Sequence, residues 1–265
     1  MNFFPQLSTG SSLQYPFQRS QVLRTLKTAG EDGTVSKYSD GGWRNVQWEL
    51  EFAGLNSSEW ASIRGHFAMA EGRLNSFPFL DGSDNLLLWS EDLSNSAWMV
   101  DPLLQVSPSV ADPNNTNHGN GIHNAGIALQ GISQTIAAPA SFTYCFSLFA
   151  RSTSGSQMIL TINGNGQQLQ QTVTVGSDWR RYMVSGNLPG SDNLVRFGLQ
   201  IEPANRVDLY GLQVEPQMGA SRYKKTTSLC GTHADCRYDQ DQLGVTSDRE
   251  GSYSTTIRLI SREPI

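Results

Sequence analysis

The chain has 265 residues, a formal net charge of −5, 25 glycines and only 16% charged residues. Low charge with many small polar residues is typical of all-β proteins and excludes a helical bundle, which needs more Ala, Glu, Lys and Leu. The acidic balance excludes nucleic acid as a partner, because such binding requires a basic face. No apolar stretch approaches the ~20 residues that span a bilayer, so we also expect no membrane partner.

The first strong element is a strand that follows a segment rich in turn formers. Residues 1–42 contain many Gly and Pro, with one short strand expected near Val22 to Lys27. The sequence WRNVQWELEF at 43–52 then alternates between apolar and polar residues, which predicts a strand with one buried face. That buried face is expected to hold Val46, Trp48, Leu50 and Phe52.

One helix is expected after this strand. Asn56 suits the N-cap and Glu59 the third helical position, a pair that forms a capping box, and Gly72 suits the end of the helix. The apolar face at helical spacing holds Trp60, Ile63, Phe67 and Ala70. His66 is expected at the surface or boundary. Regular apolar placement predicts that Trp43, Trp48, Trp60 and Phe67 are core residues, with a ligand pocket as the alternative.

The texture of the sequence changes at Asn85. From there to about Arg222 we expect no helix, and several short segments such as FTYCFSLFA and NLVRFGLQI read as strands. Turn residues punctuate them, as in PGSDN and NGNG. Many short strands at this spacing predict a β-sandwich or jelly roll. One of them is expected to place Val195, Phe197, Leu199 and Ile201 on a single face.

The last segment determines the predicted domain organisation. Residues 240–263 read as a hairpin whose second strand places Tyr253, Thr255, Ile257 and Leu259 on one face. A lone hairpin is marginal in water and needs a sheet to join, and the N-terminal region also lacks enough strands to close a core. We therefore predict a mainly β fold: residues 1–84 with 227–265 form one split, β-sandwich-like domain with one α-helix, and 85–226 form an inserted jelly roll.

The split domain resembles the distal tail and minor tail proteins of long-tailed phages and gene transfer agents. The resemblance rests on YSDGGWRNVQWELEFAGLNSSEWASIRGHFAMAEGRLNSFPFLD at 38–81 and on GSYSTTIRLISRE at 251–263. It implies a ring at the tail end, commonly six-fold, that contacts tail-tube, hub and baseplate proteins. The start, MNFFPQLSTG, lacks the features of a signal peptide. We accordingly expect a virion tail protein that is assembled in the host cytoplasm.

The insert carries a second resemblance. Its opening, NLLLWSEDLSNSAWM, and its close, DLYGLQVEPQMGASRYKKT, are similar to the jelly-roll modules of many phage tail proteins, which in turn resemble carbohydrate-binding modules. The resemblance implies one structural Ca²⁺ near the two chain ends. Glu91 or Asp92, together with Asp208, stand at positions similar to its ligands, and the alternative is that they are surface carboxylates or strand-end caps.

Sugar binding would require exposed aromatic rings beside polar side chains. The candidates in the insert are Trp98, Tyr144, Trp179 and Tyr182, with Asn163, Asn165 and Gln167 in the NGNG loop. Trp98 and Trp179 also suit core positions, because the first closes the opening motif and the second begins a strand. For these residues both interpretations stay open at the level of sequence.

Motifs for catalysis are missing, and we predict that the chain is not an enzyme. The pair His118 and His123 reads as part of a polar loop. Cys145 is expected to be buried in a strand, whereas Cys230 and Cys236, with His233 between them, suit weak zinc binding, a disulfide or free thiols.

These observations support three hypotheses of different kinds. The first is a structural component of a phage or phage-like tail, with a projecting module that binds host-surface glycans. The second is a host-adsorption protein that binds glycans and uses its tail domain only as an anchor. The third is a glycan hydrolase, because scattered carboxylates can form a catalytic pair in space.

Overall fold

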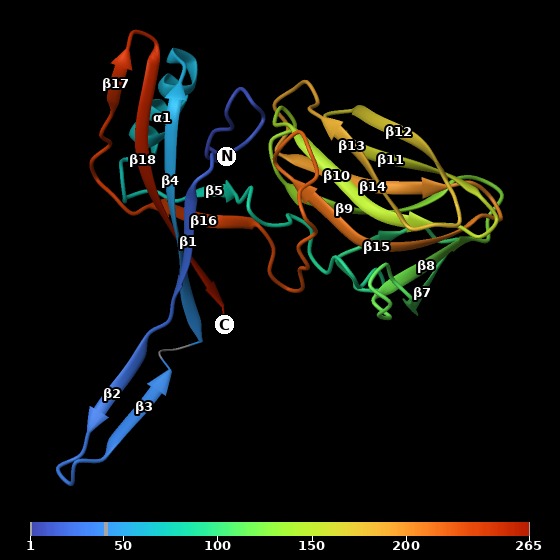
Figure 1. Cartoon of the computed structure of the whole chain (residues 1–265), viewed down its shortest axis with the longest axis horizontal. Coiled ribbons are helices and arrows are strands. Elements are labelled where there is room, and N and C mark those ends of the chain that lie inside the picture. The colour runs from blue at the N-terminus through green and yellow to red at the C-terminus, as the bar shows by residue number, and fades with distance from the viewer. Residues whose placement is uncertain (1, 40–41, 265) are drawn as a thin grey trace. The chain divides into compact units, whose positions relative to one another are not determined.

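The computed structural model describes residues 2–39 and 42–264 and is mainly β with one α-helix, as predicted (Figure 1). It contains two compact units: Met1–Leu7, Leu13–Phe79 and His233–Ile265 form unit 1, and Ser8–Ser12 with Leu80–Thr232 form unit 2. The sequence placed the boundaries at 84/85 and 226/227, and it did not assign residues 8–12 to the insert. In the described part of the chain, no helix is long and apolar enough to span a membrane.

Unit 1 is built on one antiparallel sheet in which the two ends of the chain meet. The strand order is β1 (Phe17–Val22), β4 (Trp43–Leu55), β18 (Ser252–Pro264), β16 (Thr232–Tyr238) and β5 (Phe77–Leu80). β17 (Thr246–Arg249) pairs with β18, and β2 (Thr25–Ala29) pairs with β3 (Val35–Ser39) as a separate hairpin. β4 and β18 pair from Tyr253 opposite Leu55 to Pro264 opposite Trp43. The predicted shared β-structure of the two chain ends is confirmed.

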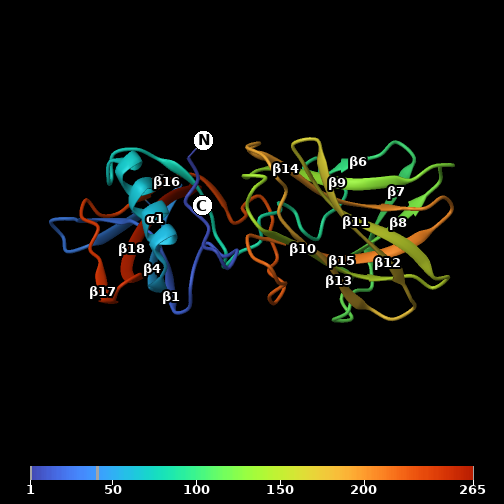
Figure 2. The same ribbon diagram turned by 90° about the horizontal axis from the view of Figure 1, so that it is seen from above.

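The helix α1 (Ser57–Ala70) packs on β4 and β18 (Figure 2). Its predicted capping box is confirmed: Asn56 Oδ1 accepts from the N–H groups of Ser58 and Glu59 at 2.9 Å, and Glu59 Oε2 accepts from the Asn56 N–H at 2.9 Å. The chain leaves the helix one residue earlier than predicted, since Glu71 already has the left-handed conformation, with φ of 52°. Gly72 follows with φ of 62°.

The core of unit 1 corrects two sequence predictions. His66 is buried rather than at the surface, and its Nδ1 lies 2.7 Å from the Tyr238 hydroxyl. Burial disfavours the charged imidazolium and lowers the pKa of His66 to about 4. Trp43 is 45% exposed rather than in the core, because it stands at the very start of β4, where the guanidinium of Arg262 covers its ring at 4.8 Å. Trp48 is buried as predicted.

Unit 2 consists of two five-stranded antiparallel sheets. The β10 sheet has the order β13 (Arg180–Gly186), β10 (Tyr144–Arg151), β15 (Arg206–Glu215), β8 (Gly119–Asn124) and β7 (Leu104–Val110). The β14 sheet has the order β12 (Gln167–Val175), β11 (Ser156–Gly164), β14 (Leu194–Ile201), β9 (Gln130–Ala137) and β6 (Met99–Val100). The eight strands β8 to β15 are divided between the sheets in the orders 8-15-10-13 and 9-14-11-12. This strand order is that of a jelly roll, as predicted.

Alternating side chains from the two sheets form the core of the jelly roll. Tyr144 of β10 meets Phe197 of β14 edge-on, with ring centroids 5.3 Å apart. The predicted inward face of β14 is confirmed, since Val195, Phe197, Leu199 and Ile201 are all buried. Cys145 is buried as well, and burial raises the pKa of its thiol. The outward faces of the two sheets therefore carry the remaining, mostly polar side chains of these strands.

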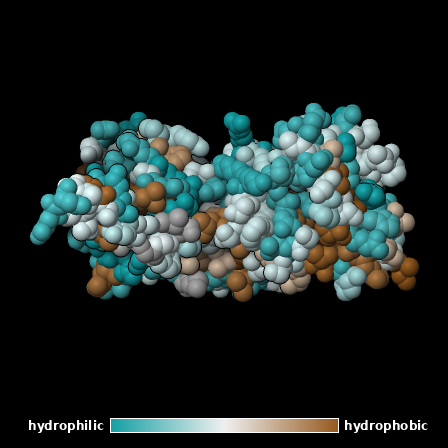
Figure 3. Space-filling model, turned by 90° about the horizontal axis from the view of Figure 1, so that it is seen from below, coloured by the Kyte–Doolittle hydropathy of each residue, from teal (hydrophilic) through white to brown (hydrophobic). Residues whose placement is uncertain are grey.

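Chain segments next to the insert's ends cover the outward face of the β10 sheet. Asn85 Nδ2 donates to the carbonyls of Leu212 and Lys224, and the Gln213 side chain accepts from the Lys224 N–H at 2.7 Å. The Tyr223 ring packs on Tyr210 of β15. On the face shown in Figure 3, hydrophilic residues occupy much of the surface, with hydrophobic residues gathered over part of the jelly roll.

Candidate functional site: a polar groove on the β14 sheet

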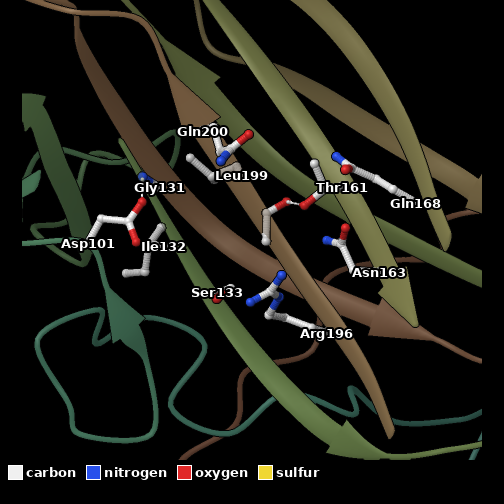
Figure 4. Close-up of a pocket in the computed structure, with 11 residues that line it drawn as sticks. Asp101, Gly131, Ile132, Ser133, Thr161, Asn163, Gln168, Arg196, Leu199 and Gln200 are labelled. Carbon is white, nitrogen blue, oxygen red and sulfur yellow. Dashed lines mark hydrogen bonds between the residues drawn. The ribbon is translucent and has the colours of Figure 1, made fainter. Parts of the chain in front are cut away.

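The outward face of the β14 sheet carries a shallow groove. On β14 the alternation that buries Phe197 turns Arg196, Gly198 and Gln200 outward. Gly198 lies between Thr161 of β11 and Ser133 of β9 in the antiparallel register. Residues from four strands, β9, β11, β12 and β14, therefore line one hollow, which Asp101 closes after β6 (Figure 4).

Two glycines create the depth of this groove. A Cβ atom at Gly198 would lie 2.6 Å from both the Ile132 carbonyl oxygen and Ser133 Cβ. At Gly131, a Cβ would lie 2.4 Å from the Leu199 carbonyl oxygen. The strands β9 and β14 can thus approach closely only if these positions carry no side chain. The missing side chains also leave room for a ligand above the backbone.

The polar side chains of the groove are largely free to bind a ligand. Among the described residues, the side chains of Ser133, Asn163, Arg196 and Gln200 have no hydrogen-bond or ion-pair partner. Thr161 instead donates to the Gly198 carbonyl at 3.2 Å, within the sheet. In Figure 4 the guanidinium of Arg196 points from β14 toward Ser133. The groove therefore offers one cation, two amides and one hydroxyl.

A second hollow of about 460 Å³ adjoins the first and shares Asn163, Gln168 and Arg196 with it. Its volume lies within the roughly 300–1,000 Å³ of small-molecule sites. Of the described residues that line either hollow, none is aromatic. The two hollows form one polar groove across the strands, suited to an extended molecule with many hydroxyl groups.

The groove lacks the paired carboxylates of a glycosidase among its described lining residues. Asp101 is its one carboxylate, and Asp101 Oδ2 accepts the Gly131 N–H at 2.7 Å. This hydrogen bond holds the carboxylate at the edge of the groove.

Two of the predicted sugar-binding aromatic residues lie in the core. Trp98 is 4% exposed and donates through Nε1 to the Trp89 carbonyl at 3.1 Å. Tyr144 is fully buried, its hydroxyl donates to the Pro139 carbonyl, and burial raises its pKa. Neither ring can stack on a sugar, so their assignment to a sugar-binding surface was wrong. Both side chains are buried, Tyr144 from β10 and Trp98 from the turn before β6.

The other predicted residues are distributed over different parts of the jelly roll. Asn163 lies in the groove. Asn165 stands in the β11–β12 turn, where its amide donates to the Pro189 carbonyl at 3.0 Å. Trp179 is half-buried beneath the guanidinium of Arg151, 5.0 Å from its ring, and Tyr182 donates to the Thr174 carbonyl. Of the predicted residues, Asn163 and Gln167 belong to the groove.

The carboxylates predicted to bind Ca²⁺ do not form a common site. Glu91 pairs with Lys225 at 2.6 Å, and Asp208 pairs with Arg151 at 3.1 Å. Asp92 accepts the backbone N–H and the hydroxyl of Ser94, as a turn-capping residue does. Each carboxylate is held by a different protein group, so these residues do not fit the cation that the resemblance implied. The capping alternative is correct for Asp92.

The cysteine and histidine predictions also have defined outcomes. None of the three cysteines forms a disulfide, and Cys236 is buried. His233 Nδ1 faces Glu263 at 3.1 Å, and the resulting hydrogen bond, together with Arg44, lowers the pKa of that carboxyl. Within residues 2–39 and 42–264, no three His, Cys, Asp or Glu side chains gather as a metal site would require.

One part of the groove could have been predicted from the sequence, namely the outward residues of β14. In NLVRFGLQI, the residues between the predicted inward ones are Arg196, Gly198 and Gln200. Their position on the outward face follows directly from the period of two. Their meeting with Ser133 and Thr161 depends on strand register and order, which no local pattern shows.

Comparison with known proteins gives matches only among solved structures; no family model and no curated protein matches the chain. The enzymatically active domain of bacteriophage CBA120 tailspike protein 4 is 12% identical, with a TM-score of 0.40 over 52% of this chain and 22% of that one. The C-terminal family 22 carbohydrate-binding module of Clostridium thermocellum Xyn10B is 16% identical, with a TM-score of 0.40 over 52% of this chain and 93% of that one.

The CBM22-1 xylan-binding domain of Paenibacillus barcinonensis Xyn10C is 11% identical, with a TM-score of 0.40. The match covers 52% of this chain and 94% of that domain. Likeness at these TM-scores decides neither fold nor function, and the match spans about a fifth of the tailspike domain. The jelly roll is therefore assigned from its own strand order.

Proposed function

We propose that this chain is a structural component of a phage or phage-like tail and that its jelly roll binds glycans of the host surface through the groove on the β14 sheet. The observation that carries the binding function is the set of free polar groups above the Gly131 and Gly198 floor. Amides and hydroxyls of this kind bind sugar hydroxyl groups.

The tail function rests on the architecture of unit 1 and on the resemblance of its sequence. β4 and β18 pair along their whole lengths, so the domain is complete although its two parts are separated in sequence by the insert. We propose that this domain forms a ring, with six copies as the expected number, in a virion tail that is assembled in the host cytoplasm. The ring would contact tail-tube, hub and baseplate proteins.

A ring would also strengthen weak glycan binding. Several identical sites on one assembly raise the overall avidity by about 10²–10⁴ over a single site, provided that they bind simultaneously. The proposed role is binding and assembly, without catalysis. Incubation of the protein with host envelope, followed by a reducing-end assay, tests this point: release of sugar fragments would contradict it.

The oligomeric state is tested by light scattering coupled to size-exclusion chromatography, and the location by immunogold labelling of intact particles. We expect an oligomer of about six copies and labelling at the tail. A strict monomer at high concentration with no label on particles would contradict the tail function. Glycan binding by such a monomer would favour an adsorption protein instead.

The binding function is tested on an array of bacterial surface polysaccharides with the full chain. We expect binding that is lost in the variant Gly198→Val, because the added side chain fills the groove floor. Gly176→Val serves as the control, since a Cβ there meets nothing within 4 Å. Equal binding by both variants would contradict the assignment of the groove.

A further inference from the structure

The chemistry of the groove points to one class of glycan. Neutral sugars gain affinity in proteins from stacking on aromatic rings, and none of the described residues lining the groove supplies one. Hydrogen bonds alone replace equivalent bonds to water, so their net contribution is small. We therefore expect a neutral glycan to bind this surface only weakly.

Arg196 supplies the missing attraction. It is exposed at the centre of the groove, lines both hollows, and is the one cationic side chain among their described lining residues. A guanidinium presents a planar fork of donors that matches the two oxygens of a carboxylate or phosphate, and such charge-assisted pairs are about twice as strong as neutral hydrogen bonds. No protein group occupies that fork in the described part of the chain.

Two other arginines of the jelly roll, Arg151 and Arg181, show how an arginine is held when it is structural. Arg181 donates to the Ser221 carbonyl and to Ser147 Oγ, and Arg151 pairs with Asp208 at 3.1 Å. Arg196 has Ser133 and Asn163 nearby in the groove, but neither carries a charge. What distinguishes Arg196 from the exposed Arg180 is its place, because Arg196 lines the groove.

We infer that the groove binds an anionic glycan, with a carboxylate or phosphate oxygen pair of the glycan on Arg196 and neighbouring hydroxyls on Ser133, Asn163 and Gln200. This inference rests on the proposed glycan binding and names its ligand class. Asp101 lines the groove at the end nearest Gly131 and Ile132, away from Arg196 (Figure 4), and would repel a second anion there. The preferred glycans therefore carry acidic sugars separated by neutral ones.

The test uses the full chain on an array that holds neutral and acidic bacterial polysaccharides, with hyaluronan fragments and oligogalacturonate as defined probes. Each acidic polysaccharide that binds is retested after carboxyl reduction and, separately, after removal of phosphate with hydrofluoric acid. Loss of binding after the first treatment identifies the carboxylate, and loss after the second identifies the phosphate. Either result supports the inference.

The variant Arg196→Gln should weaken binding of the acidic probe by about tenfold or more, and raised salt should weaken wild-type binding in the same direction. Arg180→Gln, which removes an exposed arginine from β13 of the other sheet, should bind as wild type. Binding of neutral glycans that is indifferent to Arg196→Gln would overturn the inference and leave glycan binding intact. Binding to no glycan of either class would overturn both proposals.

Discussion

On the β10 sheet, the outward polar side chains of Ser147, Gln213 and Glu215 are fully buried, whereas on the β14 sheet Arg196 and Gln168 are exposed. The two sheets belong to one sandwich and have the same number of strands. They differ in what lies above them: the segments around 85–90 and 217–227 cover the first sheet, and the groove lies open on the second.

The difference shows how polar residues on similar strands acquire different functions. Where chain segments cover a sheet, each polar group must find a protein partner, because an unpaired buried donor or acceptor costs free energy. Glu215 accordingly binds Ser221 and Lys224. Where solvent covers the sheet, polar groups can stay unpaired until a ligand arrives. The comparison predicts that equivalent substitutions destabilise the fold on one sheet and affect binding on the other.

The largest loss of stability is expected for Asn85→Ala, in a segment that covers the β10 sheet. Asn85 is fully buried; its amide donates to Leu212 and Lys224, and its Oδ1 accepts from the N–H groups of Leu87 and Val214. Its removal takes away four hydrogen bonds to backbone groups, three of them buried, which should lower the free energy of unfolding by about 3–5 kcal/mol. Differential scanning calorimetry measures the loss. A loss below about 1 kcal/mol would contradict the idea that polar groups at the covered sheet stabilise the fold.

The variant Lys224→Met should have the next largest effect. Lys224 Nζ lies 3.1 Å from Glu215 Oε1, and the Glu215 side chain is fully buried. The substitution leaves a buried carboxylate with fewer partners, and we expect a loss of about 2–3 kcal/mol. Lys37→Met is the control, because Lys37 is exposed on β3 of the other unit. Hydrogen exchange of β15 should increase in the first variant only.

The jelly roll shows how far sequence can predict such a structure. Alternation in NLVRFGLQI predicted the buried face of β14, and paired opening and closing motifs predicted the insert. The aromatic candidates were misplaced because Tyr144 and Trp98 are amphipathic residues that suit either a core or a surface. Which sheet is covered depends on the path of segments far apart in sequence, as the contacts of Asn85 show, and no local pattern contains that path.

Unit 1 was predictable for a different reason. Its strand at 43–52 and its helix carry strong periodicity and a capping box, so each could be assigned locally. His66 and Trp43 were misassigned because the local sequence pattern does not show how far the rest of the domain covers a side chain on the helix or at the end of a strand. In both units, then, local patterns predicted the elements, and tertiary cover decided the environment of individual residues.

The groove floor offers a smaller test, the variant Gly198→Ala. A Cβ at this position meets backbone and side-chain atoms at 2.6 Å, so we expect a loss of about 1–2 kcal/mol from overpacking. Gly176→Ala has open space and should keep the wild-type free energy of unfolding. Calorimetry of the two variants side by side checks this. Equal stabilities would mean that the close approach of β9 and β14 at Gly198 relaxes without cost.

The smallest effect on stability is expected for Asn163→Ala on the open sheet, the same substitution as at Asn85. Asn163 is half-buried, and its side chain has no partner among the described residues, so the free energy of unfolding should change by less than about 0.5 kcal/mol. Glycan binding should weaken about threefold to tenfold, since one hydrogen bond of about 1 kcal/mol is lost. A destabilisation comparable to that of Asn85→Ala would show that both sheets use their polar residues for packing, and the contrast between them would disappear.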